Sequence, residues 1–176
     1  MACSQTLSGL IRDCAPNAGG LRKVWIANAT DISSVDMVDD NVISGFIMDG
    51  AKKFKEYAFA RGAASLTSNW QVNAENGTKY VDSDLVLVFN RMDSAKRIEI
   101  LALMSAELVI VAEDANGKRW CLGAFAGGSV TDPVIGSTST GDGLTGTARA
   151  DRNGYSITFH WSSSGLPLEV FGTVPV

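Results

Sequence analysis

The sequence predicts a mostly β fold: an antiparallel β-sandwich or small barrel built from hairpins, with one flanking α-helix. The first observation is turn chemistry. Asn-Gly and Asp-Gly pairs suit tight hairpin turns because these residues tolerate positive φ. Four such pairs lie between segments with strand character: Asp49-Gly50, Asn76-Gly77, Asn116-Gly117 and Asn153-Gly154. They predict four hairpins.

The second observation is hydrophobic alternation. Segments 65–73 and 155–162 alternate apolar and polar residues, which predicts strands with one buried face and one polar face. Their apolar residues are Leu66, Trp70 and Val72, and Tyr155, Ile157, Phe159 and Trp161. By contrast, LVLVF (85–89) and LVIV (108–111) are apolar throughout, which predicts strands covered on both faces.

One helix is predicted between these two apolar runs, over about 93–104. Asp93 is a good N-cap, with Ser94 as an alternative. The apolar residues that follow recur at helical spacing and predict one apolar helix face. That face consists of Ala95, Ile98, Leu101 and Ala102.

The 176 residues fit a single domain, 1–176. Residues 1–20 form an N-terminal arm, in which a short helix near 5–12 is conceivable. Segments 29–41 and 136–146 are rich in aspartate and in glycine, serine and threonine respectively, and we expect loops that a partner orders. The candidate inter-subunit residues in these loops are Asp36, Asp39, Asp40, Asn41, Ser137, Thr138 and Asp142.

The charge balance argues against tight nucleic-acid binding. The formal net charge is −4 and the pI about 4.9, whereas proteins that grip phosphates are basic, at least locally. The first residues lack the pattern of a secretory signal, and no apolar run approaches the length of a membrane span. We therefore expect a soluble protein, made in a cytoplasm, with no membrane partner.

Few residues suggest chemistry. The single histidine, His160, lies among serines and threonines, without a GxSxG nucleophile motif. Cys3, Cys14 and Cys121 are odd in number and widely spaced, so we expect free thiols, with Cys121 in a core strand; a Cys3–Cys14 crosslink stays open. The acidic run 36–41 lacks the glycine and glutamate of a calcium loop. Catalytic, cofactor-binding and metal-binding residues are therefore all predicted to be absent, and no enzyme is expected.

The polar faces of the two alternating segments are unusual because they contain no Lys, Arg, Asp or Glu. Solvent-facing strands usually include charges, which also block edge pairing. A hydroxyl and amide surface would suit the wall of a water-filled passage, whereas a weakly charged exterior sheet face is an equally good interpretation. The candidate lumen-facing residues are Ser65, Thr67, Asn69, Gln71, Asn73, Ser156, Thr158, His160 and Ser162.

Parts of the sequence resemble a known group of proteins. MACSQTLSG at the start, then Cys14, then Gly19-Gly20 leading into KVWIAN, resembles the start of virion proteins from phages of Bacteroidetes-type bacteria. The middle is similar too, with ENGTKY, an apolar strand, RMDSAKRIEILAL, another strand and DANGKRW. The similarity spans roughly residues 1–160, and the order of elements resembles that of phage tail tube proteins.

This resemblance implies a fold of two packed β-sheets with a flanking helix, and a structural role in the virion. In that family, six subunits form a ring, and stacked rings form the channel through which DNA is ejected. The implied partners are copies of the chain itself, other tail proteins and transiting DNA. Loops and the N-terminal arm would bridge rings. Lumens in that family are often acidic, whereas the two polar faces above are neutral, so either other strands supply the acidic residues or these faces are the wrong ones.

Two other functions remain open. The first is another virion component, such as a tail terminator, a connector ring or a capsid decoration protein, because hairpin-rich β folds serve those roles equally well. The second is a glycan-binding β-sandwich that stacks sugars on Trp25, Trp70, Trp120 or Trp161. Because Trp70 and Trp161 fall on apolar strand faces, we expect both to pack in the core.

Overall fold

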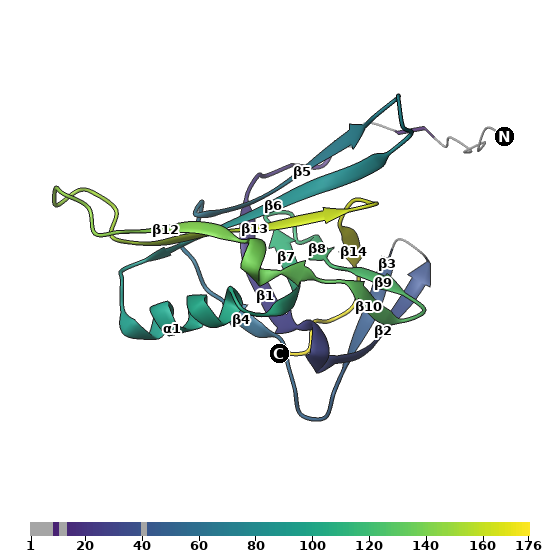
Figure 1. Ribbon diagram of the computed structural model, residues 1–176, viewed down its shortest axis with the longest axis horizontal. Coiled ribbons are helices and arrows are strands. Elements are labelled where there is room, and N and C mark those ends of the chain that lie inside the picture. The colour runs from purple at the N-terminus through teal and green to yellow at the C-terminus, as the bar shows by residue number, and fades with distance from the viewer. Residues whose placement is uncertain (1–8, 11–13, 40–41) are drawn as a thin grey trace.

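The computed structural model describes residues 9–10, 14–39 and 42–176. It contains an eight-stranded sheet, a four-stranded sheet and a two-stranded hairpin (Figure 1). The larger sheet has the spatial order β2 (Ile32–Asp39), β3 (Val42–Met48), β14 (Leu168–Val170), β8 (Arg119–Leu122), β7 (Glu107–Asp114), β1 (Leu21–Asn28) and β4 (Lys55–Tyr57), and β11 (Val134–Ile135) also pairs with β7.

The four-stranded sheet has the order β12 (Thr140–Leu144), β13 (Gly154–Ser163), β6 (Lys79–Asn90) and β5 (Ala64–Val72), and all its pairs are antiparallel. Strands β9 (Ala124–Ala126) and β10 (Ser129–Asp132) form the hairpin. The helix α1 (Ser94–Leu103) and the short 3-10 turns η1 (Ala29–Asp31) and η2 (Gly136–Thr138) complete the described elements. The mostly β sandwich with one flanking α-helix is confirmed; neither main sheet closes into a barrel within the described residues.

Two apolar clusters hold the layers together. The first lies between the four-stranded sheet and one face of β1, β7 and β8, and it includes Leu87, Phe159 and Ile110. The second lies on the other face of β1 and β7, where the larger sheet curls back and packs Val35 and Phe46 against it. Strands β1 and β7 therefore form the middle layer, covered on both faces.

The prediction that both apolar runs form strands covered on both faces is confirmed for 108–111 and is wrong for 85–89. Residues 108–111 in β7 are at most 1% exposed, as predicted. Residues 85–89 in β6 are covered on one face only, because Leu85, Leu87 and Phe89 are buried, while Val86 and Val88 are half-buried. The prediction for 85–89 is wrong because no layer covers the outer face of the four-stranded sheet within the described residues.

The predicted burial of the apolar residues is confirmed for one alternating segment and is wrong for part of the other. In β13, Ile157, Phe159 and Trp161 are buried as predicted. In β5, Trp70 is 71% exposed and Val72 is 64% exposed, so the prediction that they pack in the core is wrong. The β5–β6 hairpin projects past the body (Figure 1), and no described residue covers the apolar side of β5 at Trp70 and Val72.

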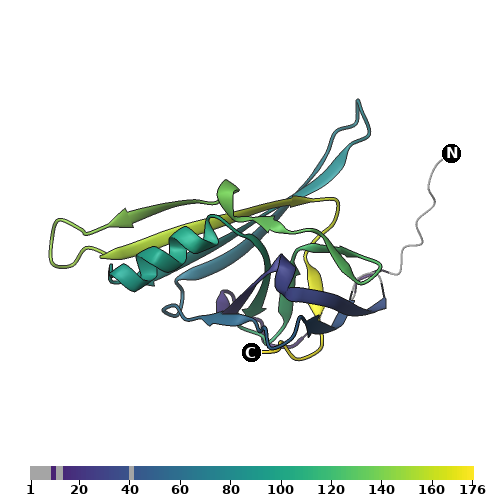
Figure 2. The ribbon, with the colours of Figure 1, turned by 60° about the horizontal axis from the view of Figure 1, so that its bottom comes forward.

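The helix is confirmed, but the predicted buried face is wrong. Asp93 caps α1, and its carboxylate accepts a hydrogen bond from the Lys96 amide at 2.8 Å. Figure 2 shows α1 lying along the long strands of the four-stranded sheet. It buries Leu103 and partly buries Ile100 there.

The predicted apolar stripe of α1 faces solvent. Ala95, Ile98, Leu101 and Ala102 are all exposed, with Ile98 at 63%. A hydrogen bond from the Tyr57 hydroxyl on β4 to the Glu99 carboxylate joins the opposite side of α1 to the body. Burial, reinforced by Glu99, raises the pKa of Tyr57, so its hydroxyl stays protonated and keeps donating.

Turn chemistry predicts two hairpins correctly. Asn76-Gly77 joins β5 to β6, and Asn116-Gly117 joins β7 to β8. Asp49-Gly50 forms a turn, but the strands on either side do not pair with each other, since β4 pairs with β1. Strands β12 and β13 do form a hairpin, but residues 145–153 connect them, and Gly154 is already the first residue of β13.

Both predicted loops contain strands. Segment 29–41 forms η1 and β2, so Asp36 and Asp39 lie in a strand; residues 40–41, Asp40 and Asn41, lie outside the described residues. The alternating Ile32, Val35 and Met37 pair with β3 through irregular register, and this tertiary pairing outweighs the aspartates.

Segment 136–146 forms η2, which holds Ser137 and Thr138, and then β12, which holds Asp142. Its glycines have low strand propensity, but pairing along the whole of β12 with β13 imposes the strand. Whether either segment contacts another subunit stays a prediction.

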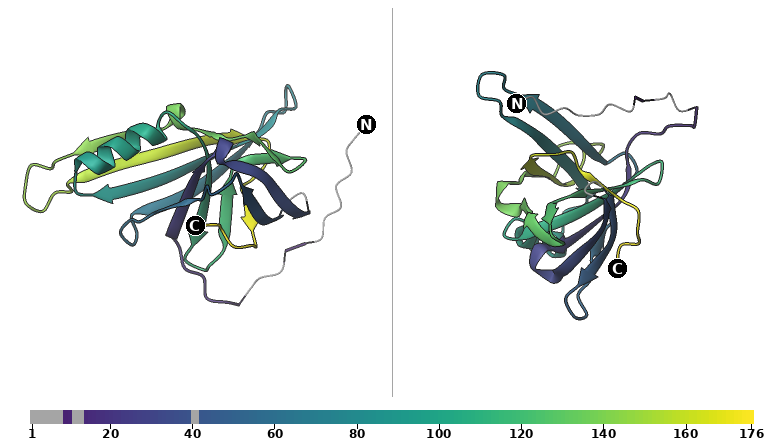
Figure 3. Two further views of the ribbon diagram at one scale, coloured as in Figure 1. Left: turned by 90° about the horizontal axis from the view of Figure 1, so that it is seen from below. Right: turned by 90° about the vertical axis from the view of Figure 1, so that its right-hand side faces the viewer.

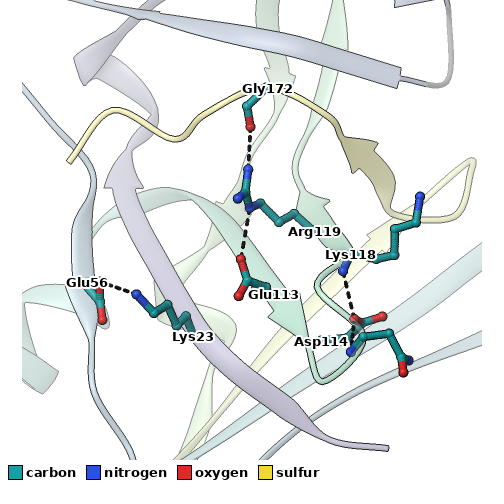
Figure 4. A network of polar contacts seen from close by, with 8 residues as sticks. Lys23, Glu56, Glu113, Asp114, Lys118, Arg119 and Gly172 are labelled. Carbon is teal, nitrogen blue, oxygen red and sulfur yellow. Dashed lines mark hydrogen bonds and ion pairs between the residues drawn. The ribbon is translucent and has the colours of Figure 1, made fainter. Parts of the chain in front are cut away.

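The chain after β14 is held against the larger sheet by a polar network (Figure 4). The Arg119 guanidinium donates to the Gly172 carbonyl at 2.7 Å and to the Glu113 carboxylate at 3.1 Å. The Arg119 guanidinium also lies 5.9 Å from the centre of the buried Trp25 ring. This network fixes the far side of the body, away from the four-stranded sheet.

Cysteine positions match the prediction where they are described. Cys121 is fully buried in β8 as a free thiol, and burial raises its pKa. Cys14 is exposed and free, while Cys3 and most of the conceivable helix 5–12 lie outside the described residues. Among the described helices, none is long and apolar enough to span a bilayer.

Adjacent residues on β6 give a matched test of this layering. We expect Leu87→Ala to lower the free energy of unfolding by about 2–5 kcal/mol, because Leu87 is fully buried between the sheets. Val88→Ala, on the uncovered face, should cost less than about 1 kcal/mol. Urea denaturation of the dispersed chain measures both, and equal losses would contradict the assignment of the two faces.

Candidate functional site: the free face of the four-stranded sheet

The outer face of the four-stranded sheet collects nearly all the predicted lumen-facing residues. Directly opposite residues in an antiparallel ladder point to the same side, and the register places the two polar faces on one side of β6. From β5 come Ser65, Thr67, Asn69 and Gln71, and from β13 come Ser156, Thr158, His160 and Ser162. Asn73 lies just beyond the end of β5, in the turn, where its amide donates to the Thr78 carbonyl.

The middle strand β6 supplies residues that the sequence analysis missed. Asp84 lies between His160 and Thr67, and Asp82 lies between Ser162 and Asn69. Asp142 on β12 stands opposite Ser156 on the same face. The face is therefore acidic along one half of its middle strand, at Asp82 and Asp84, whereas Val86 and Val88 make the other half apolar. Strands β5 and β13 contribute no carboxylate to it.

One chain of hydrogen bonds crosses three strands on this face. The His160 Nδ1 lies 2.6 Å from an Asp84 carboxylate oxygen, and its Nε2 lies 2.9 Å from the Thr140 hydroxyl. A carboxylate only accepts, so Nδ1 is the donor to Asp84, and Nε2 forms the second hydrogen bond with the Thr140 hydroxyl. His160 therefore ties the edge strand β12 to β6.

Hydroxyl, imidazole and carboxylate in this order also form the relay of a nucleophilic hydrolase. Such a relay needs donors that stabilise a developing oxyanion. The pocket beside His160 is lined instead by Asp82, Asp84 and Asp132, which would repel an oxyanion. The arrangement thus favours a structural role for His160, and the absence of catalysis stays a prediction.

A metal site is not apparent on this face. Within residues 9–10, 14–39 and 42–176, no group of three or more His, Cys, Asp and Glu side chains is placed to hold a metal ion. Around the face, Asp142 forms an ion pair with Arg152 at 3.3 Å, and Asp84 is hydrogen-bonded to His160. The hydroxyl, amide and carboxylate groups of this surface can form hydrogen bonds with water.

The two edges of this sheet lack the usual protection against pairing. Exposed edges are normally blunted by short strands, charges, proline or bulges. Strand β5 is nine residues long and has neither a charged residue nor proline, and β12 has one charge, Asp142. No strand in the described part of the chain pairs with the outer side of β5 or β12.

The edges of the larger sheet are protected, by contrast. Edge strand β4 has only three residues, two of them the charged Lys55 and Glu56. Edge strand β2 contains Asp36 and Asp39 and pairs with β3 through three register shifts. The open edges therefore belong specifically to the sheet that bears the polar face.

Gly141 lets β12 approach β13 closely. A Cβ atom at this position would lie 2.3 Å from the Ser156 carbonyl oxygen, a distance that real Cβ atoms do not show. Since neither strand can move without breaking their ladder, glycine is needed here for a close approach of the two backbones.

Comparisons of the chain with protein-family models, with curated proteins and with solved structures find no match. The fold and the geometry of the free face therefore carry the functional argument.

A substitution at Gly141 tests how β12 is held. We expect Gly141→Ala to lower the free energy of unfolding by about 1–3 kcal/mol and to speed amide exchange along β12, because the new Cβ forces the strands apart. Hydrogen exchange measures this locally. The control is Gly165→Ala, where no atom lies within 4 Å of the added Cβ, and its effect should stay within about 0.5 kcal/mol. Unchanged β12 exchange in Gly141→Ala would contradict the close approach.

Proposed function

We propose that this protein is the repeating subunit of a phage tail tube, a structural virion protein whose copies form stacked, six-membered rings around a channel for DNA. The observation that carries the proposal is the four-stranded sheet. Within the described residues, one of its faces is uncovered and largely polar, with Asp82 and Asp84 on its middle strand, and neither of its edges pairs with another strand. The resemblance of the sequence to tail tube proteins supports the same function.

Strand directions fit a closed ring. Four antiparallel strands in a row leave β12 and β5 running in opposite directions. Rotation about a channel axis preserves the direction of every strand, so β12 of one copy meets β5 of the next as an antiparallel pair. A head-to-tail contact of this kind is an allowed closed assembly and removes all the open edges.

The size of the ring fits DNA passage. Six copies of a four-stranded sheet would give a closed sheet of 24 strands. With a strand spacing of about 4.8 Å and a tilt of about 40°, opposing backbones would lie roughly 50 Å apart. Side chains narrow this space, but it remains wider than a DNA duplex.

The chemistry of the face fits a channel lining. The opposite face of the sheet is buried against the body, so the polar face is the one that can line a channel. Asp82 and Asp84 repel phosphates, and hydroxyl and amide groups keep the wall hydrated. DNA would then pass without being held.

Another ring-forming virion component, a terminator or a connector, would use the same edges. Copy number per particle distinguishes these components, because a tube subunit must be far more abundant. The exposed Trp70 favours a second candidate, a glycan-binding module, since an exposed indole can stack on a sugar ring. Glycan binding that is abolished by Trp70→Ala would support this candidate.

Cysteine crosslinking tests the ring. We expect a chain with one cysteine on β5, at Thr67 or Asn69, and one on β12, at Thr140 or Asp142, to form a ladder of oxidised species that ends at the closed ring. Several pairs are needed because the register across the junction decides which Cα atoms come within about 4.4–6.8 Å. Denaturing electrophoresis counts the subunits, and negative-stain microscopy shows the rings.

The background for this experiment replaces Cys3 and Cys14 by serine and keeps the buried Cys121. Chains with the β5 cysteine alone are the control, and they should not crosslink in a ring. Crosslinked dimers from β5 cysteines alone would indicate two-fold pairing of β5 with β5. That result, or a strictly monomeric protein at high concentration, would contradict the proposal.

A further inference from the structure

The four-stranded sheet extends beyond the body at both of its ends (Figures 1 and 3). At one end, the β5–β6 hairpin projects with its turn at 73–78. At the other end, residues 145–153 connect β12 to β13. The two projecting ends lie at opposite ends of the molecule, along the direction of the strands.

The hairpin end carries an apolar surface that no described residue of the chain covers. Trp70 and Val72 lie on the same side of β5 as the buried Ala64 and the half-buried Leu66, which pack in the core. Trp70 lies opposite the buried Val81 of β6 but is itself 71% exposed on the edge strand. Contiguous exposed apolar surface marks interaction sites, and tryptophan is enriched among the residues that contribute most to binding.

The opposite end also carries an exposed apolar residue. Leu144, the last residue of β12, is 48% exposed. Asn153 links the connection 145–153 to the end of β6: the Arg91 amide donates to its backbone carbonyl at 2.6 Å, and the Met92 amide donates to its side-chain oxygen at 2.9 Å. These two hydrogen bonds hold the connection 145–153 in place against the end of β6.

The charges at the two ends are complementary. At the hairpin end, Glu75 and Asp82 outnumber Lys79. At the opposite end, the cations of segments 91–97 and 145–153 outnumber the carboxylates. Arg149 in the connection is exposed and forms no ion pair with any described residue. The hairpin end is therefore acidic and exposes an indole, and the opposite end of the same molecule is basic and exposes a leucine. The two ends are complementary in charge, and both are partly apolar.

We infer that the β5–β6 hairpin packs, through Trp70 and Val72, on the β12–β13 end of a second copy of this chain in the next ring. The inference rests on the proposed function, because stacking rings bring these two ends of the sheet together. The contact is head-to-tail and does not close, so it propagates along one axis and makes a tube rather than a pair of rings. Glu75 would lie near Arg149 and give the contact its direction.

The direct test removes the apolar surface of the hairpin. In Trp70→Ser/Val72→Ser, we expect rings to form but the protein concentration at which tubes appear to rise at least tenfold. Sedimentation and negative-stain microscopy measure this. The matched control is Val38→Ser on β2 of the larger sheet, which removes a valine of the same exposure as Val72 (64%) from outside the four-stranded sheet and should leave tube formation unchanged. Circular dichroism verifies that each variant is folded.

A charge exchange tests the partner surface with little risk to folding, because both residues are exposed. Glu75→Arg alone and Arg149→Glu alone should each weaken stacking, and the combined variant should recover at least half of the lost tube length. Failure of the combined variant to recover, together with normal tubes from Trp70→Ser/Val72→Ser, would overturn the inference while leaving the rings intact. Absence of rings in the unmodified protein would instead overturn the proposed function.

Discussion

The contact between the two sheets determines the rest of this structure. Leu85, Leu87 and Phe89 on β6, with Ile157 and Phe159 on β13, bury their side chains against β1 and β7. Burial on this scale is the dominant favourable term in folding. Because side chains alternate along a strand, burying this face forces the remaining residues of β5, β6 and β13 onto the other side. A one-residue slip would exchange the two faces, so the polar surface is as strongly specified as the core.

The middle layer makes this arrangement rigid. Strands β1 and β7 contribute side chains to both apolar clusters, so the curled larger sheet and the four-stranded sheet are joined through the same two strands. The free face therefore belongs to a firmly supported sheet. Its hydrogen-bonded chain from Thr140 through His160 to Asp84 extends this order to the edge strand β12.

Local sequence signals predicted those parts of the fold that local chemistry controls. Asp93 capping the helix, the turns at Asn76-Gly77 and Asn116-Gly117, and the alternation of β13 could all be read from short segments, because each depends on neighbours in the sequence. The fold class followed from them. Of the candidate site, the polar residues of β5 and β13 were predicted, but their meeting on one face depends on the register with β6, which no short segment contains.

The errors share a physical cause, which is that burial depends on distant elements. Trp70 alternates like a core residue but lies exposed on the edge strand β5, and Ile98 follows a helical stripe that faces away from the core. Segment 140–144 has glycines that disfavour a strand, yet pairing with β13 outweighs them. Asp82 and Asp84 were missed because the apolar run that follows them predicts a strand covered on both faces, which hides the alternation of Tyr80, Asp82 and Asp84 with buried Val81 and Ser83.

In the described part of the chain, the four-stranded sheet has unpaired edges across its strands and exposed apolar residues at the two ends of its strands. Across the strands, β5 and β12 leave backbone donors and acceptors open, although the same molecule protects the edges of its other sheet with charges, a short strand and register shifts. Along the strands, one end exposes Trp70 and the other exposes Leu144. An isolated subunit that had to avoid self-association would need protection in both directions. Within the described residues, the four-stranded sheet lacks this protection in both directions, whereas the larger sheet has protected edges. This contrast is the physical basis of the proposed assembly, in which identical copies close around the polar face and stack along its length.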